Sequence, residues 1–206
     1  MNHLTIGIFG DKDNALLKKL GNKGTINDLE FRNSAEDDYV LTFCAPKSEK
    51  VVSLLQASAL VDVPVIVFDN PSPELGEAIL ALDAMQYPVG IICVSEGFGR
   101  DKVNSIVEKT ALSSYHVIPY DAVALKELLT DEAFYASIPC PQGPAKVPID
   151  NYFMVRSVGT VVLGMVKRGE VGVYTKMLVY PHKTEVLVKS MQSQDKDVRK
   201  AVTLQR

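Results

Sequence analysis

The stretch GIFGDKDNALLKKLG, from Gly7 to Gly21, joins an apolar run to a segment with helical spacing, and it decides the fold class. The run LTIGIF that leads into it is rich in β-branched residues and favours a buried strand. The segment NALLKKL then places its leucines on one face of a helix. A strand, a glycine-containing turn and a helix in this order indicate the first step of a parallel α/β sheet.

The same alternation continues through residues 1–138. The apolar runs YVLTFC, VPVIVF, VGIICV and YHVIPY are separated by segments with helical spacing. One helix is predicted to have Ser72 or its neighbour as N-cap and Pro73 at an early helical position, and another to have Ser48 as N-cap, with Glu49 in its first turn. The pair LEFRN and YVLTF predicts an antiparallel hairpin at the sheet edge. We therefore expect a mostly parallel sheet covered by helices on both faces.

A change of composition marks a second domain. Four prolines and a glycine fall within SIPCPQGPAKVPID, which predicts a linker over residues 139–148. From residue 149 to 206, β-forming residues alternate and glycines punctuate them at Gly159, Gly164, Gly169 and Gly172. This pattern predicts a small antiparallel β barrel, in which Gly159 and Gly169 fit turns that need a positive φ.

Composition narrows the class of protein. The formal net charge of -3 over 206 residues argues against a chain that coats nucleic acid by bulk electrostatics. No apolar run reaches the roughly 20 residues of a membrane span, and the N-terminus lacks the pattern of a signal peptide. The three cysteines contain no CxxC pair, which favours reduced thiols and no structural zinc. We expect a cytoplasmic protein without a membrane partner.

The second domain carries a resemblance. The segment DNYFMVRSVGTVVLGMVKRGEV resembles the second domain of translational GTPases of the EF-Tu group, which includes the selenocysteine-specific elongation factors. The later segment VKSMQSQDKDVRKA resembles a further strand of the same domain. The resemblance implies a GTPase-like, P-loop NTPase-like α/β domain followed by an EF-Tu domain 2-like barrel. Because the family's barrel continues past this region, it also predicts a barrel that is incomplete at the C-terminus.

The nucleotide motifs of that family are missing from the first domain. Its phosphate loop ends in Gly-Lys-Ser/Thr, whereas here Gly10 and Asp13 match and the chain then passes directly from Asn14 into the helix. Its Asp-x-Pro-Gly-His motif corresponds to CAPKSEK, in which Pro46 matches and Lys47 replaces the glycine. The guanine-reading motif corresponds to SEGF, and the last motif to Tyr120-Asp121. The residues of this degenerate pocket are Gly10, Asp11, Lys12, Asp13, Asn14, Pro46 and Lys47.

A phosphate loop works because backbone N–H groups, a lysine and a hydroxyl surround the phosphates and magnesium. With these groups missing, the sequence predicts a pseudo-GTPase with no catalytic residue, no nucleotide cofactor and no metal. The resemblance implies that the barrel binds tRNA, the ribosome or a translation-factor protein. The residues expected to contact such a partner are Arg156, Gly159, Thr160, Lys167 and Arg168. The simpler interpretation of the three basic residues is ordinary charge in turns.

Two other functions remain open on the sequence. One is an active GTP-binding elongation factor with an atypical pocket. The other is a small-molecule or metal sensor, which would use the acidic residues that follow predicted strands: Asp11, Asp13, Asp69, Glu96 and Asp121. Separately, Cys44 and Cys93 end predicted strands, which leaves a redox or metal role open for them. For the acidic residues we favour helix capping over metal binding, and for the cysteines small buried side chains.

Overall fold

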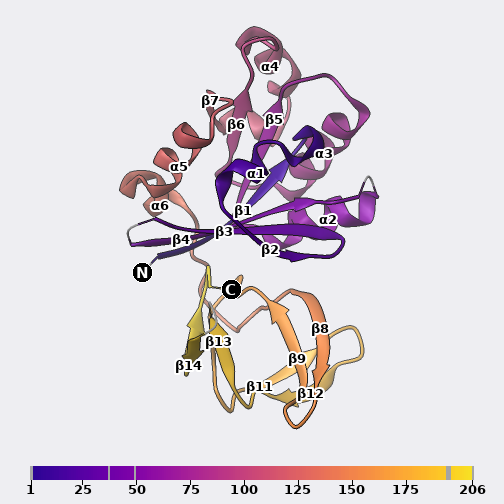
Figure 1. The fold of residues 1–206 in the computed structure, drawn as a ribbon, viewed down its shortest axis with the longest axis vertical. Coiled ribbons are helices and arrows are strands. Elements are labelled where there is room, and N and C mark those ends of the chain that lie inside the picture. Colours follow the sequence, from indigo (N-terminus) through magenta and orange to yellow (C-terminus); the bar gives the residue numbers. More distant parts are fainter. Residues whose placement is uncertain (1, 37, 49, 194–195, 206) are drawn as a thin grey trace. The chain divides into compact units, whose positions relative to one another are not determined.

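The chain folds into two compact units, Met1–Pro139 and Cys140–Arg206. The computed structural model describes residues 2–36, 38–48, 50–193 and 196–205. Figure 1 shows the first unit as a sheet with helices on both faces and the second unit as strands and turns. Among the described helices, none has the length and apolarity that crossing a membrane requires.

The first unit contains a seven-stranded sheet in the order β2-β3-β4-β1-β5-β6-β7. Five strands, β4, β1, β5, β6 and β7, run parallel, while β3 pairs antiparallel to β4 and β2 antiparallel to β3. The strands are β1 Asn2–Phe9, β2 Asn22–Ile26, β3 Leu29–Glu36, β4 Tyr39–Pro46, β5 Val63–Phe68, β6 Ile91–Val94 and β7 His116–Pro119. The predicted hairpin is β3–β4, and β2 adds a further strand at the edge where we expected the hairpin itself.

Helices connect these strands. They are the 3-10 turns η1 Lys12–Asn14 and η2 Ala111–Ser114 and the α-helices α1 Leu17–Leu20, α2 Val51–Leu60, α3 Pro73–Met85, α4 Arg100–Val107, α5 Ala122–Thr130 and α6 Glu132–Ser137. The core lies between them and the sheet. All six residues of β5 are buried, as are the last six of β1, because strands at the centre of a parallel sheet are covered on both faces.

The starts of α2 and α3 can be compared with the N-cap residues predicted from the sequence. Ser72 is the N-cap of α3, as predicted, and its hydroxyl accepts a hydrogen bond from the Leu75 N–H. The prediction for α2 was wrong, because its N-cap is Lys50 and the Ser48 Oγ lies 2.8 Å from the Ser53 Oγ. Glu49 lies outside the described residues.

The second unit consists of short antiparallel pairs. They are β8 Ile149–Val155 with β9 Gly159–Gly164, β10 Glu170–Gly172 with β15 Lys200–Val202, β11 Lys176–Val179 with β12 Thr184–Leu187, and β13 Met191–Ser193 with β14 Lys196–Val198. Gly159 and Gly169 have φ of 105° and 68°, which confirms the prediction that both turns need glycine. Closure of these pairs into a barrel stays a prediction.

Residues 140–148, the greater part of the predicted linker, belong to the second unit and bond to its residues Arg168 and Gly169. Lys146 and Arg168 form an isolated antiparallel β-bridge through their backbones, and the Gly169 N–H donates to the Pro141 carbonyl. A Cβ on Gly169 would lie 2.2 Å from the Gly143 carbonyl oxygen. The proline-rich segment therefore packs closely along the residues that connect β9 to β10.

Gly90→Ala is expected to destabilise the first unit. A Cβ at Gly90 would lie 2.3 Å from the ring of buried Tyr115, and overpacking of this kind costs about 1–3 kcal/mol. Gly76→Ala is the matched control, because nothing lies within 4 Å of its added Cβ. Within a helix that change should stabilise by about 0.5–1 kcal/mol. Urea unfolding of both variants measures the difference, and equal stabilities would contradict the packing at Gly90.

Candidate functional site

The loops after the parallel strands meet at one edge of the first unit's sheet. In open parallel sheets, this carboxyl edge is where ligands bind. The loop after β1 carries Gly10 to Asn14, and the loops after β6 and β7 carry Ser95–Phe98 and Tyr120. Figure 1 shows β5 and β6 between β1 and β7, so contacts between the first and last of these loops cross the sheet edge.

Asp11 is the anion of this edge. One of its carboxylate oxygens accepts hydrogen bonds from the N–H groups of Leu16, at 2.8 Å, and Leu17, at 3.1 Å. These groups belong to the start of α1, where N–H groups are left without partners inside the helix. A bound phosphate uses the same kind of donors. The carboxylate of the chain therefore holds the donors that an external anion would need.

Tyr120 binds the second oxygen of the same carboxylate. Its hydroxyl donates to Asp11 Oδ1 at 3.0 Å, although the two residues lie 109 positions apart. Burial raises the pKa of Asp11 above its ordinary value, and the hydrogen bonds from Leu17, Tyr120 and Leu16 offset part of that rise. Burial, followed by the charges of Asp11 and Asp69, raises the pKa of the Tyr120 hydroxyl. Tyr120 therefore stays a proton donor at neutral pH.

The other residues of the predicted pocket point elsewhere. Lys12 and Asp13 are exposed in η1. Asp13 and Asn14, the last two residues of η1, have φ of 56° and 52°, a left-handed conformation in which an α-helix cannot start. This backbone shortens the helix to Leu17–Leu20, whereas the sequence predicted one that starts at Asn14.

Asn14 faces β3 through Glu30. Its side-chain amide lies 3.5 Å from Glu30 Oε2, and Arg32 forms a 2.7 Å salt bridge to Glu30 Oε1. Burial raises the pKa of the Glu30 carboxyl, but hydrogen bonds from Arg32 and Asn14 and the charges of Arg32 and Lys18 lower it overall. Lys18 in turn donates to the Asp13 carbonyl at 2.7 Å. The loop is thus fastened to the sheet by polar contacts of its own.

Gly10, Pro46 and Lys47 complete the predicted set. Gly10 has a φ of 72°, and a Cβ there would lie 2.9 Å from the Val67 carbonyl oxygen, so the loop runs tightly against β5. Pro46 is the last residue of β4 and pairs with Leu29. The exposed Lys47 donates its N–H to the Asp28 carbonyl at 3.0 Å. Pro46 and Lys47 therefore close the turn beside β3.

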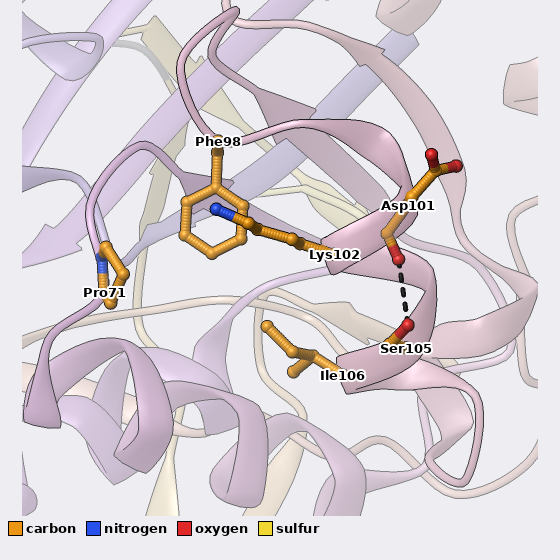
Figure 2. Close-up of a pocket in the computed structure, with 6 residues that line it drawn as sticks. All are labelled: Pro71, Phe98, Asp101, Lys102, Ser105 and Ile106. Carbon is orange, nitrogen blue, oxygen red and sulfur yellow. Dashed lines mark hydrogen bonds between the residues drawn. The ribbon is translucent and has the colours of Figure 1, made fainter.

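The loop that stands for the guanine-reading motif turns into the core. The Phe98 N–H donates to the Ser95 carbonyl, and the Phe98 ring meets the Phe68 ring edge to face with centroids 5.3 Å apart. Figure 2 shows Phe98 beside a pocket of about 450 Å³. The pocket is lined by Pro71, Phe98, Asp101, Lys102, Ser105 and Ile106. Because Phe98 is buried, this position serves packing.

The metal-sensor hypothesis gains no support at this edge. Within residues 2–36, 38–48, 50–193 and 196–205, no three His, Cys, Asp or Glu side chains are grouped to hold a metal ion. Asp121 caps α5 by accepting from Val123 and Ala124, which is the capping that we favoured. Cys44 and Cys93 lie on β4 and β6, with two strands between them, so roughly 14 Å separates them. Burial, then the charge of Asp11, raises the Cys93 pKa to about 12.

The expected partner-binding residues of the second unit fall at two places. Arg156 and Thr160 are exposed at the tip of the β8–β9 hairpin, and Gly159 stands between them. Lys167 and Arg168 follow the other end of β9 and are half-buried. Since β8 has seven residues, roughly 20 Å separates the two places. Arg168 is also held by the segment before β8, because its Nε donates to the Pro144 carbonyl at 2.9 Å.

The sequence did not single out the contacts that define this edge. Tyr120 was noted as a departure from a motif, and nothing local pairs it with Asp11. The Glu30–Arg32 pair has an i,i+2 spacing, which places both side chains on one face of a strand, and this was the available signal. Phe98 follows a glycine at the end of a polar turn, where an aromatic residue that anchors the core is hard to tell from a ligand contact.

Comparison with known proteins supports the resemblance at the level of fold. No family model matches the chain. The chain is 32% identical, over 203 residues, to an uncharacterized protein of Methanocaldococcus jannaschii, covering 98% of the chain and 65% of that protein. It is 27% identical, over a 240-residue alignment, to the selenocysteine-specific elongation factor of the same organism, covering 96% of the chain and 50% of that factor.

Solved structures give the same result. The elongation factor SelB of Methanococcus maripaludis, crystallised with the GTP analogue GppNHp, matches the whole chain and 50% of its own length, with a TM-score of 0.78 and 24% identity. A bacterial selenocysteine-specific elongation factor matches the whole chain and 41% of its own length, with a TM-score of 0.81 and 18% identity. The fold is therefore one found in these translational GTPases. The chain spans about half to two thirds of the curated relatives it matches.

The stability of the Asp11→Asn variant, relative to that of the wild-type protein, is expected to increase as pH rises. The pKa of Asp11 in the folded protein is raised above its unfolded value of 3.8, so the folded state holds its proton to higher pH. The stability contributed by the wild-type residue is therefore complete below that unfolded value and is lost as pH rises through the folded pKa. An asparagine keeps a hydrogen-bond acceptor without this loss. Denaturant unfolding between about pH 3.5 and 7 measures the difference.

The control is Asp13→Asn, two residues along the chain, whose side chain is exposed. Its stability relative to wild type should change less with pH across the same range. If the two variants show the same pH dependence, Asp11 is not the buried carboxylate described above.

Proposed function

We propose that the chain is an elongation-factor-like protein whose first unit is a pseudo-GTPase and whose second unit binds RNA or a translation-factor partner. The observation that carries the first part is the Asp11 carboxylate on the N–H groups of Leu16 and Leu17. The position where a phosphate would bind is already filled by an anion that belongs to the chain.

Electrostatics supports this assignment. A phosphate that took these N–H groups would have to break the two hydrogen bonds that Asp11 accepts from Leu16 and Leu17, and hydrogen bonds to charged groups contribute about 1.5–3 kcal/mol each. It would also approach the carboxylate charge without the lysine that neutralises phosphates in a phosphate loop. The exposed Lys12 precedes α1 within η1, and Lys18 bonds to the Asp13 carbonyl.

The positions that would bind a guanine base are also taken up by contacts within the protein. Phe98 packs on Phe68 where the guanine-reading loop would lie, and Tyr120 bonds to Asp11 where the last motif would lie. A guanine base would therefore meet an aromatic core contact and a hydroxyl that is already used. We propose that the first unit acts as a folded scaffold and has no nucleotide cycle.

The partner-binding proposal rests on likeness to the elongation factors and on the exposed hairpin tip. Arg156 and Thr160 are exposed there, and Tyr152 and Met154 on β8 are each about three-quarters exposed. A cation beside aromatic and apolar side chains is the combination that binds single-stranded nucleic acid. We place the contact with RNA at this tip, because Arg168 at the other end of β9 is held by the Pro144 carbonyl.

Calorimetric titration with GTP and with GDP, in the presence of magnesium, is expected to give no binding heat up to millimolar nucleotide. SelB of Methanococcus maripaludis, which was crystallised with a GTP analogue, serves as the positive control under the same conditions. Micromolar binding to the chain would overturn the pseudo-GTPase proposal, and would mean that the loop can release Asp11 from Leu16 and Leu17.

Arg156→Ala is expected to weaken binding of tRNA to the whole chain, because it removes a phosphate contact at the exposed tip. Losing one such contact should lower the slope of log affinity against log salt by about 1. Arg100→Ala, an exposed arginine of the first unit, is the matched control and should leave both quantities unchanged. Filter binding at several salt concentrations measures them, and equal slopes for wild type and Arg156→Ala would exclude this tip as the RNA contact.

A further inference from the structure

Charge is divided unevenly between the two units. Residues 140–206 carry 11 lysines and arginines against 5 aspartates and glutamates, a formal net charge of +6. Residues 1–139 carry 11 against 20, a net charge of -9. The total of -3 therefore combines a basic second unit with an acidic first unit. A polyanion such as RNA would be attracted to the second unit and repelled by the first.

Within the second unit, β11 presents basic, apolar and aromatic side chains to water. Lys176 and Leu178 lie two residues apart and so share one face of the strand, and Tyr180 follows at the same spacing. Leu178 and Tyr180 are exposed by 53% and 67%, whereas Met177 and Val179, which alternate with them, are half-buried. The exposed side chains therefore form a row on the outer side of β11.

Strand β12 extends this surface. It pairs antiparallel with β11, as Figure 1 shows, and places Leu187 opposite Lys176 and Glu185 opposite Leu178. Leu187 is exposed by 49%. The Glu185 carboxylate forms a 2.9 Å salt bridge to the Lys176 ammonium group. Two further lysines, Lys183 in the turn and Lys189 after β12, are exposed, so cations outnumber the single carboxylate along this pair of strands.

A second tyrosine, Tyr174, lies at the other end of β11 in an unfavourable backbone conformation. Its side chain is exposed by 75% and its φ is 67°, a left-handed value that is uncommon for a bulky residue. Its N–H donates to the Val188 carbonyl at 2.7 Å, which holds this backbone against the chain after β12. Residues kept in such conformations cluster at functional sites. Here the strained backbone carries an aromatic ring that lies in water.

We name this surface the β11 face and define it as Tyr174, Lys176, Leu178, Tyr180 and Leu187. We infer that the β11 face binds single-stranded RNA, whose unpaired bases stack on the two tyrosine rings. The inference rests on the proposal that the second unit binds RNA, and it adds a surface on a different pair of strands from the β8–β9 tip.

The chemistry of the β11 face matches unpaired RNA. Single strands are bound by aromatic side chains on which bases stack and by cations that follow the phosphates. Tyr174 and Tyr180 lie six positions apart, roughly 20 Å at the rise of an extended strand, so two different bases of one strand would stack on them. Lys183 and Lys189 lie beyond the two ends of β12, where they can neutralise phosphates along the same path. A duplex would offer its phosphates but not the faces of its bases.

Fluorescence anisotropy of the full chain with fluorescein-labelled decauridine tests the β11 face. Tyr180→Ala is expected to lower the affinity about fivefold or more, because it removes one stacking platform, and Tyr180→Phe should bind like the wild type. Tyr174→Asn should cause a similar loss while keeping a residue that tolerates a positive φ. Leu80→Ala is the matched control, because Leu80 is exposed by 71% on α3 of the first unit. A blunt RNA duplex should compete about tenfold less well than unlabelled decauridine.

The tip of the β8–β9 hairpin is tested separately, so the two proposals can fail independently. Arg156→Ala should leave decauridine binding within about twofold of wild type. A chain that binds tRNA but not decauridine up to several hundred micromolar would overturn the β11 face alone, as would tyrosine variants that bind decauridine like the wild type. If neither RNA binds, both proposals fail. Self-association that Tyr180→Ala abolishes, without RNA binding, would instead assign this face to a protein contact.

Discussion

The Asp11 carboxylate joins the loops at the carboxyl edge of the first unit's sheet. It accepts hydrogen bonds from the first N–H groups of α1 and from the Tyr120 hydroxyl. These contacts join the loop after β1 to the loop after β7, across the ends of β5 and β6. Where such an edge binds a nucleotide, the ligand supplies the anion. Here the anion is a side chain of the protein itself, and it bonds to the N–H groups of Leu16 and Leu17.

Side chains near Asp11 are also bonded within the protein. Asn14 is fastened to β3 through Glu30 and Arg32, and Phe98 is fastened to the core through Phe68. Groups that could have faced a ligand instead stabilise the fold. The tip of the β8–β9 hairpin, by contrast, places apolar side chains such as Val158 in water.

Much of the architecture could be predicted from the sequence, because it depends on short-range periodicity. The alternation of apolar runs and helical segments predicted the parallel sheet, and Ser72 marked the start of α3 correctly. The errors arose where backbone conformation overrode propensity. Positive φ at Asp13 and Asn14 shortens α1, and the N-cap of α2 is Lys50 in place of the predicted Ser48. Neither feature follows from hydrophobic spacing.

By itself, the sequence determined the fold class and the loss of the Gly-Lys-Ser/Thr core, because both depend on residues close together in the chain. Only the tertiary structure decided that Asp11 meets Tyr120, since the strand order brings together two loops 109 residues apart. It also placed Arg156 and Arg168 at opposite ends of one strand, and it turned the serines of α2 inward. These outcomes depend on which face of each element the rest of the chain covers, and local spacing does not carry that information.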